Sequence, residues 1–175
     1  MNIQAQIEFT RPSGFSLNTQ LKIGHPGVTA IYGQSGAGKS TLLRILAGLE
    51  HGNHTDKINI TVDEHIWQNQ DQFLLPEKRA IGVVFQDQHL FPHLSVQDNL
   101  LFALKRQHSP SSISLENIIA WFELGPLLNQ KVSLLSGGES QRAAIARVII
   151  NAPKIILMDE PLASLDYPAK QRILN

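Results

Sequence analysis

The chain has 175 residues, enough for one core that buries about 70% of the unfolded surface, so it can fold as a domain of ordinary size. Its 15 Lys and Arg balance its 15 Asp and Glu, which argues against a protein that grips many nucleic-acid phosphates. Without cysteine, the chain has no disulfide, thiolate metal site or cysteine nucleophile.

The first part of the chain predicts antiparallel strands at Gln4–Phe9, Phe15–Ile23 and Ile58–Trp67, where apolar residues partly alternate with polar ones. Val28–Tyr32 is instead a continuous apolar run, typical of a buried strand. It leads through a glycine-rich turn into Thr41–Leu49, whose apolar residues recur at helical spacing. The order indicates a strand, a loop and a helix.

The remainder predicts two more strands and three helices. Ile81–Phe85 and Ile155–Met158 are continuous apolar runs, as in parallel strands that are buried on both faces. Helices are expected from Ser95 to Leu104, from Ser114 to Gly125 and from Ser136 to Ile150. The longest apolar run, Leu100–Leu104, is far short of the about 20 residues that span a bilayer. The prediction is a cytoplasmic protein with a parallel α/β core, an antiparallel β flank and a helical insert.

The strongest local signal is GQSGAGKS at residues 33–40, which fits GxxxxGK[ST] between a predicted strand and a predicted helix. Its glycines let backbone N–H groups surround phosphates, the lysine reaches the outer phosphates, and the final serine ligates Mg²⁺. The alternative is a glycine-rich helix entry without a ligand. The predicted nucleotide-binding residues are Gly33, Gln34, Ser35, Gly36, Ala37, Gly38, Lys39 and Ser40, followed by Thr41.

A pair of carboxylates, Asp159 and Glu160, follows the predicted strand Ile155–Met158. The carboxyl edge of a parallel sheet is where such sheets bind ligands. One carboxylate, assigned to Asp159, can hold Mg²⁺ through water, and Glu160 is placed to orient or deprotonate a water for attack on the γ-phosphate. A plain polar loop entry is the alternative for the pair on its own.

The sequence LSGGESQR at residues 135–142 has an ordinary explanation, because Ser136 and Glu139 have the spacing of a capping box. Two adjacent glycines, Gly137 and Gly138, are not needed for a cap, but they suit a helix that must approach a phosphate closely. With the two motifs above, this segment resembles the signature of the ATP-binding cassette (ABC) family. The order of the three motifs extends over nearly the whole chain.

The resemblance implies a P-loop ATPase of the ABC type that binds ATP and Mg²⁺ as a head-to-tail homodimer. In such a dimer, Ser136, Gly137 and Gly138 of one subunit face the γ-phosphate held by residues 33–40 of the other. Gln86 resembles the family's hinge glutamine, which contacts Mg²⁺ or water, with a plain polar strand end as the alternative. Residues 163–166 resemble the D-loop, although Asp166 also suits a helix N-cap. Phe9 and Phe15 are the candidates for stacking on adenine.

The interval before the signature resembles the ATP-binding subunits of bacterial importers, and those of molybdate importers most of all. Residues 75–79 and 84–93 carry this likeness. It implies transmembrane permease subunits as partners, a peripheral location on the cytoplasmic face of the membrane, and substrate recognition by other subunits. The segment 88–96 is expected to expose Leu90, Phe91 and Leu94 for docking to the permease. His89 and His93 are interpreted as surface of this segment.

The predicted organisation has three parts: residues 1–86 and 139–175 form the nucleotide-binding core, and residues 87–138 form a helical signature subdomain. The residues after Asp166 are too few for the crossover that would lead to another parallel strand and the family's switch histidine. The sequence thus predicts a truncated cassette whose hydrolytic activity is open. A nucleotide-binding domain that associates without hydrolysis is the alternative to an importer ATPase.

Overall fold

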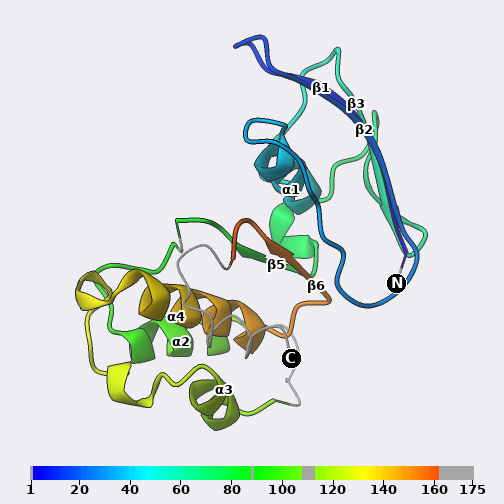
Figure 1. The fold of residues 1–175 in the computed structure, drawn as a ribbon. Helices are drawn as coiled ribbons and strands as arrows, with labels where there is room; N and C mark the ends of the chain where they lie inside the picture. The colour runs from blue at the N-terminus through cyan, green and yellow to red at the C-terminus, as the bar shows by residue number, and fades with distance from the viewer. Residues whose placement is uncertain (1, 88, 108–112, 162–175) are drawn as a thin grey trace. The chain divides into compact units, whose positions relative to one another are not determined.

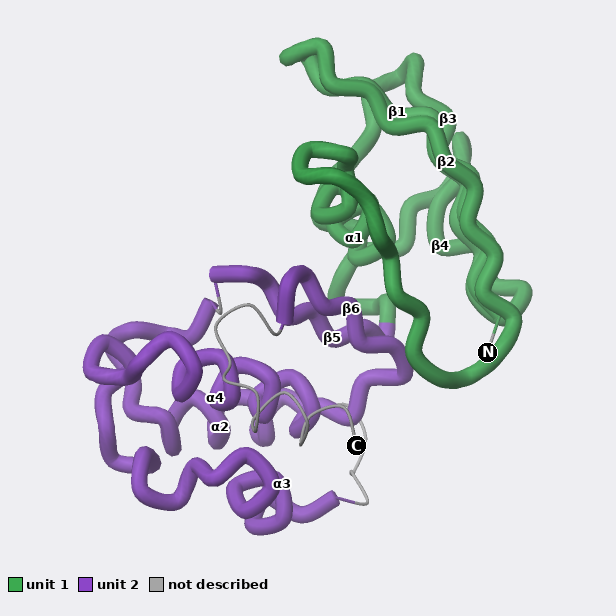
Figure 2. Tube along the Cα trace, in the orientation of Figure 1, with its two compact units in different colours: residues 1–79 green, residues 80–175 purple. Residues whose placement is uncertain are grey.

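The computed structural model describes residues 2–87, 89–107 and 113–161. It divides the chain into two compact units, residues 1–79 and residues 80–175 (Figure 2). The segment predicted to be the D-loop, residues 163–166, lies outside the described residues. None of the helices in the described ranges has the length and apolar character needed to cross a membrane.

The first unit contains a four-stranded antiparallel sheet in the order β2-β1-β3-β4. Figure 1 labels three of these strands, β1, β2 and β3. The strands are β1 (Ile3–Thr10), β2 (Ser16–Ile23), β3 (Lys57–Val62) and β4 (His65–Gln68). Odd-numbered residues of β1 are buried and most even-numbered ones are exposed, which is the period-two pattern of a sheet with one covered face. The antiparallel strands predicted at Gln4–Phe9 and Phe15–Ile23 are therefore confirmed.

The single strand expected over Ile58–Trp67 is wrong, because the chain forms a hairpin there. Asp63 and Glu64 adopt positive φ angles of 46° and 68° between β3 and β4. Two consecutive left-handed residues make the two-residue turn that matches the twist of a hairpin. Neither residue is glycine, which is why the turn is hard to see in the sequence.

The expectation of a strand at Val28–Tyr32 is also wrong in this structure. The described chain has no regular secondary structure between β2 and α1 (Lys39–Ala47), and the side chains of Val28 and Tyr32 are 95% and 92% exposed. An apolar run becomes a buried strand only where other strands flank it. No strand of the antiparallel sheet pairs with this run.

The second unit contains a parallel strand pair and three helices. β5 (Ile81–Val84) and β6 (Ile155–Met158) pair in register, with Ile81 opposite Ile155 and Val84 opposite Met158. The pair confirms the predicted parallel strands, but burial on both faces is wrong, since most of β5 is half-buried and Ile156 is 38% exposed. α4 (Gly137–Ile150) packs against β5, α2 (Val96–Leu104) and α3 (Leu115–Trp121).

Each of these three helices begins at the serine that the sequence indicates. The hydroxyls of Ser95, Ser114 and Ser136 accept hydrogen bonds from the N–H groups three residues later, as N-caps do. Only the end of α3 differs, because the helix stops at Trp121 rather than at Gly125, and Glu123 has a positive φ. Short 3-10 turns complete the fold at Pro76–Lys78, Gly125–Leu127 and Val132–Leu134.

A buried arginine that nothing in the sequence reasoning indicated holds the end of α1. The guanidinium of Arg79 donates to the carbonyls of Ile45 and Leu46, at 3.0 and 2.9 Å, and to that of Leu74 at 2.8 Å. It also lies over the ring of Phe73, 4.9 Å from the centroid. Burial lowers the pKa of Arg79 to about 10, so the group stays charged at neutral pH. Arg79 thus adds hydrogen bonds to carbonyls in the last turn of α1, where the carbonyl of Ile45 also accepts from the N–H of Gly48 at 3.0 Å.

Gly48 leaves the space that this guanidinium fills. Gly48 has a φ of 75°, and a Cβ there would lie 2.7 Å from Cζ of Arg79. We expect Gly48→Ala to lower the free energy of unfolding by about 2–3 kcal/mol, because it combines left-handed strain with displacement of a buried cation. Urea unfolding measures this loss. Gly24→Ala is the matched control, since nothing lies within 4 Å of its Cβ position, and a loss of similar size there would contradict the explanation.

Candidate functional site

The loop at residues 33–40 has the backbone of a phosphate cradle. Gly36 and Gly38 adopt φ angles of 79° and 95°, which other residues rarely take. The ammonium of Lys39 donates to the carbonyls of Gly33 and Gln34, both at 2.9 Å. The lysine therefore spans its own loop and holds a positive charge over it.

The N-terminus of α1 has no side chain to cap it. Gly38 is its N-cap residue, and among the described residues no side-chain cap bond is present at this helix start, whereas serines cap α2, α3 and α4. Unpaired N–H groups and the positive end of the helix dipole favour an anion at this position. Together with the lysine, the arrangement suits a phosphate group.

Ser40 and Thr41 differ in exposure. Ser40 is exposed at the start of α1, as an Mg²⁺ ligand must be, whereas Thr41 is 6% exposed and belongs to the buried face of the helix. Thr41 thus offers a ligand its backbone N–H from the first turn rather than its hydroxyl.

The structure distinguishes the two aromatic candidates for adenine. Phe9 is 4% exposed, in the core of the sheet, and is not available for stacking. Phe15 is partly exposed and lies against the loop, because a Cβ added at Gly38 would meet its Cζ at 2.8 Å. The guanidinium of Arg11 stands 5.6 Å from the centre of its ring and pairs with Glu50 through two hydrogen bonds of 2.6 and 2.7 Å.

The second unit brings Gln86, Asp159 and Glu160 to one edge of the parallel pair. Because Val84 is opposite Met158, the residues that follow β5 and β6 leave the sheet at the same edge. The N–H of Asp159 donates to the carbonyl of Val84 at 2.9 Å, which continues the ladder up to the carboxylates. Asp159 is half-buried, and Glu160 is exposed with a positive φ of 49°. An amide and two carboxylates at a sheet edge form a donor set that fits Mg²⁺.

A buried glutamine that the sequence reasoning gave no role fixes this edge to α4. Gln141 is 1% exposed, and its Nε2 donates to the carbonyl of Pro161, the residue after Glu160, at 3.0 Å. The signal in the sequence is a polar residue at the helical spacing of the apolar residues Ala144 and Ile145, since a polar side chain on a buried face needs a hydrogen-bond partner.

The predicted signature residues form a capping box, so the ordinary interpretation of the serine is confirmed. The carboxylate of Glu139 accepts from the N–H and the hydroxyl of Ser136, at 2.8 and 2.7 Å. These bonds lower the pKa of Glu139. The cap is therefore present above the usual pKa of a glutamate and is lost as the pH falls through the lowered value. Gly137 is exposed and Gly138 half-buried, so the helix start is open to a second molecule.

The predicted docking segment is less exposed than expected. Leu90 is 8% exposed and belongs to the core of the second unit, so its assignment to an exposed patch is wrong. Phe91 and Leu94 are half-buried, and Gln88 lies outside the described residues. Phe91 packs against Phe102, with ring centroids 4.6 Å apart. The apolar residues of this segment serve the helical core first.

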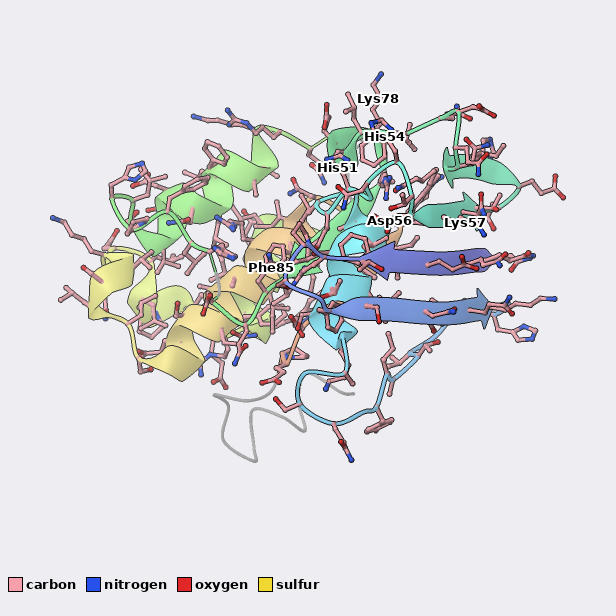
Figure 3. The ribbon with its side chains drawn as sticks, turned by 90° about the horizontal axis from the view of Figure 1, so that it is seen from above. His51, His54, Asp56, Lys57, Lys78 and Phe85 are labelled. Atoms are coloured by element: carbon pink, nitrogen blue, oxygen red, sulfur yellow. The ribbon has the colours of Figure 1, made fainter. Side chains whose placement is uncertain are left out.

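The histidines show no metal site in the described part of the chain. No group of three or more His, Cys, Asp or Glu there has the geometry to hold a metal ion. His51 and His54 lie on the loop before β3 (Figure 3), where the ring of His51 packs on that of Phe73 at 4.4 Å. Asp56 on the same loop accepts from the N–H of Thr10 at 2.9 Å, which ties the loop to β1. Asp56 therefore supports the sheet.

The sequence of the chain is similar to those of known transporter proteins. A family model described as ABC transporter matches residues 17–163. Molybdenum import ATP-binding proteins named ModC are similar, including one from Hahella chejuensis that is 44% identical over 95% of this chain and 46% of its own length. One from Saccharophagus degradans is 49% identical over 90% of this chain and 43% of its own. The chain spans about half the length of these curated relatives.

Solved structures agree with the fold. The ATP-binding cassette MJ0796, in a dimeric post-hydrolysis state bound to ADP and Pi, matches 98% of this chain and 79% of its own, with a TM-score of 0.81 and 29% identity. A second dimeric structure of MJ0796, described as a bacterial ABC transporter cassette, matches with the same TM-score and 28% identity.

Proposed function

Because the chain belongs to the ABC transporter family, we propose that it binds and hydrolyses ATP to energise an importer in the membrane, with molybdate or a related oxyanion as the transported substrate. The observation that supports this most is the glycine-rich loop at the uncapped start of α1, where Lys39 already holds a positive charge. A helix N-terminus without a cap and a nearby lysine together fit a compact polyanion such as a nucleotide phosphate.

Each predicted residue has a role in this proposal. Residues 33–41 bind the phosphates through backbone N–H groups and Lys39, and Phe15 stacks on adenine. Ser40, Gln86 and Asp159 hold Mg²⁺, directly or through water. Glu160 accepts a proton from the attacking water, which Gln86 helps to place. Mg²⁺, when bound, neutralises charge that develops on the phosphates.

The proposed assembly is an ATP-bound homodimer docked on permease subunits. The open N-terminus of α4, with Ser136, Gly137 and Gly138, would complete the ATP site of the other subunit. Ser136 must first give up its bond to Glu139, because its hydroxyl is donated there in the isolated chain. The dimeric MJ0796 cassettes support this assembly, and the location is the cytoplasmic face of the membrane.

Three measurements test the proposal. Equilibrium binding of Mg·ATP and steady-state release of phosphate are expected to be positive for the full-length protein assembled with its membrane subunits, and vesicle uptake of radioactive molybdate is expected to require ATP. Binding without turnover would favour the alternative, a nucleotide-binding domain that acts by association alone. ATP-dependent uptake of another solute, without molybdate, would contradict the substrate but not the ATPase.

The metal dependence of ATP binding tests Asp159 separately. Asp159→Asn is expected to weaken binding of Mg·ATP by about 10-fold and to leave binding of metal-free ATP within about twofold, because a neutral amide holds Mg²⁺ or its bound water less strongly than a carboxylate does. Titration with and without EDTA measures both affinities. Asp71→Asn, in an exposed turn of the first unit, is the control. Equal losses for both ligands would contradict the metal role.

A further inference from the structure

One arginine holds the segment that follows Gln86 against the signature helix. Arg147, on the last turn of α4, donates from Nη2 to the carbonyl of His89 at 2.8 Å. Its guanidinium lies over the ring of Phe91, 5.1 Å from the centroid, and its Nη1 is 3.5 Å from Oδ1 of Asn99. A single side chain thus contacts the segment at two places and α2 at a third.

Asn99 on α2 binds the same segment. Asn99 is fully buried, and its Oδ1 accepts from the N–H of Phe91 at 2.9 Å while its Nδ2 donates to the carbonyl of Phe91 at 3.2 Å. Nδ2 also donates to the carbonyl of Ser95 at 2.9 Å. The amide therefore pairs with both backbone groups of Phe91, as a neighbouring strand would, and such buried bonds are costly to break.

Gln86 and Asp87 lie in a turn that precedes this anchored part. His89 has a positive φ of 46°, and its ring meets that of Phe85 edge-on, with centroids 4.9 Å apart and planes at 86°. In the sequence, Phe85 directly precedes Gln86, and His89 follows three residues after Gln86. Phe85 is labelled in Figure 3. The ring contact therefore links His89 to the residue that precedes Gln86.

The stability of the fold alone does not explain an arginine at position 147. In the described part of the chain its hydrogen-bond acceptors are a carbonyl and an amide oxygen, with no carboxylate. Burial lowers the pKa of Arg147, because partial removal from water destabilises the charged form of the guanidinium. A half-buried cation without a counter-ion contributes little net stability compared with an apolar side chain. Its fork of donors is better suited to fixing geometry.

We propose that Arg147 is a positioning residue for Gln86: it makes the turn after β5 move together with α4, whose N-terminus carries Ser136, Gly137 and Gly138. This inference rests on the proposed function, since the position of Gln86 matters for turnover only in a chain that hydrolyses ATP. Arg147 does not touch the nucleotide. It changes the rate of the chemical step through Gln86 and leaves ATP affinity to the loop of the first unit.

A double-mutant cycle tests this role in the full-length protein. Arg147→Met keeps an unbranched apolar chain about as long as the aliphatic stem of arginine and removes the donors, and we expect kcat to fall by about 10-fold with KM within about twofold. In a Gln86→Ala background the same change is expected to cost less than about twofold, because the residue it positions is gone.

Arg142→Met is the matched control. Arg142 lies on the same helix and also donates to a carbonyl, that of Phe122 at 3.0 Å, but it ties α4 to the end of α3. Its effect on kcat is expected to be additive with Gln86→Ala. Hydrogen exchange adds a readout that needs no turnover: the amide of Phe91 is expected to exchange faster in Arg147→Met and unchanged in Arg142→Met.

Arg147→Lys keeps the charge and one donor, so partial recovery of kcat is expected, and this variant serves in the cycle if Arg147→Met does not fold. Additive losses with Gln86→Ala, or a raised KM with unchanged kcat, would overturn the positioning role while leaving the ATPase intact. A wild-type protein that binds no ATP would overturn the proposed function, and the positioning role with it. The two failures are therefore distinguishable.

Discussion

Replacing Lys39 by alanine is expected to lower the affinity for ATP by at least about 100-fold. The lysine is the one side chain of the loop at residues 33–40 that carries a positive charge, and a charge-assisted bond to phosphate is among the strongest that a site can offer. A 100-fold loss corresponds to about 2.7 kcal/mol. The substitution also removes two bonds to the carbonyls of Gly33 and Gln34, so the cradle itself becomes less ordered. Fluorescent-nucleotide titration measures the affinity.

The control for Lys39→Ala removes the same charge elsewhere. Lys22 is exposed on β2, and Lys22→Ala is expected to leave ATP affinity within about twofold. Circular dichroism checks that both variants keep the wild-type fold. If Lys39→Ala retained affinity within about threefold of the wild type, the phosphate assignment of residues 33–40 would have to be abandoned.

Glu160→Gln is expected to reduce ATP turnover by at least about 100-fold and to change ATP affinity by less than about threefold. The amide has the shape of the carboxylate but cannot accept the proton of the attacking water, and general-base catalysis contributes about 100- to 10,000-fold. With hydrolysis blocked, ATP stays in the site, so the ATP-bound dimer is expected to accumulate. Phosphate release and light scattering, in the full-length protein, measure the two effects.

The control for Glu160→Gln is Glu77→Gln, which makes the same change at an exposed glutamate in a 3-10 turn of the first unit. Turnover there is expected to match the wild type. Wild-type turnover in Glu160→Gln would show that another group accepts the proton, whereas loss of turnover together with loss of binding would place Glu160 among the groups that hold ATP.

The sequence predicts best where local chemistry decides the structure. The serine caps of α2, α3 and α4 depend on one hydroxyl and one N–H three residues away, so a short pattern is enough to find them. The strands β5 and β6 are also found from short, bounded apolar runs, although their pairing joins residues far apart in the sequence. The motif residues at 33–40 come with their own backbone requirement, which Gly36 and Gly38 meet.

Apart from the hairpin turn at Asp63 and Glu64, the main failures share a different cause, since they depend on partners distant in sequence. Val28–Tyr32 has the composition of a buried strand but no neighbour in the sheet of its unit. Leu90 looks like part of an exposed patch until the helices that cover it are known. Arg79 and Gln141 are ordinary polar residues in the sequence, and only the buried carbonyls that they contact give them a role.

The register of β5 and β6 has a consequence for how the chain tolerates insertions and deletions. Val84 is opposite Met158, and successive side chains of a strand point to opposite faces. Loss of one residue within β6 would move Glu160 into the position of Asp159 and turn both carboxylates to the other face. The loops before and after the pair can change length without this effect. Insertions and deletions that the protein tolerates are therefore expected outside residues 81–84 and 155–160. This holds even if residues within these two segments can be substituted.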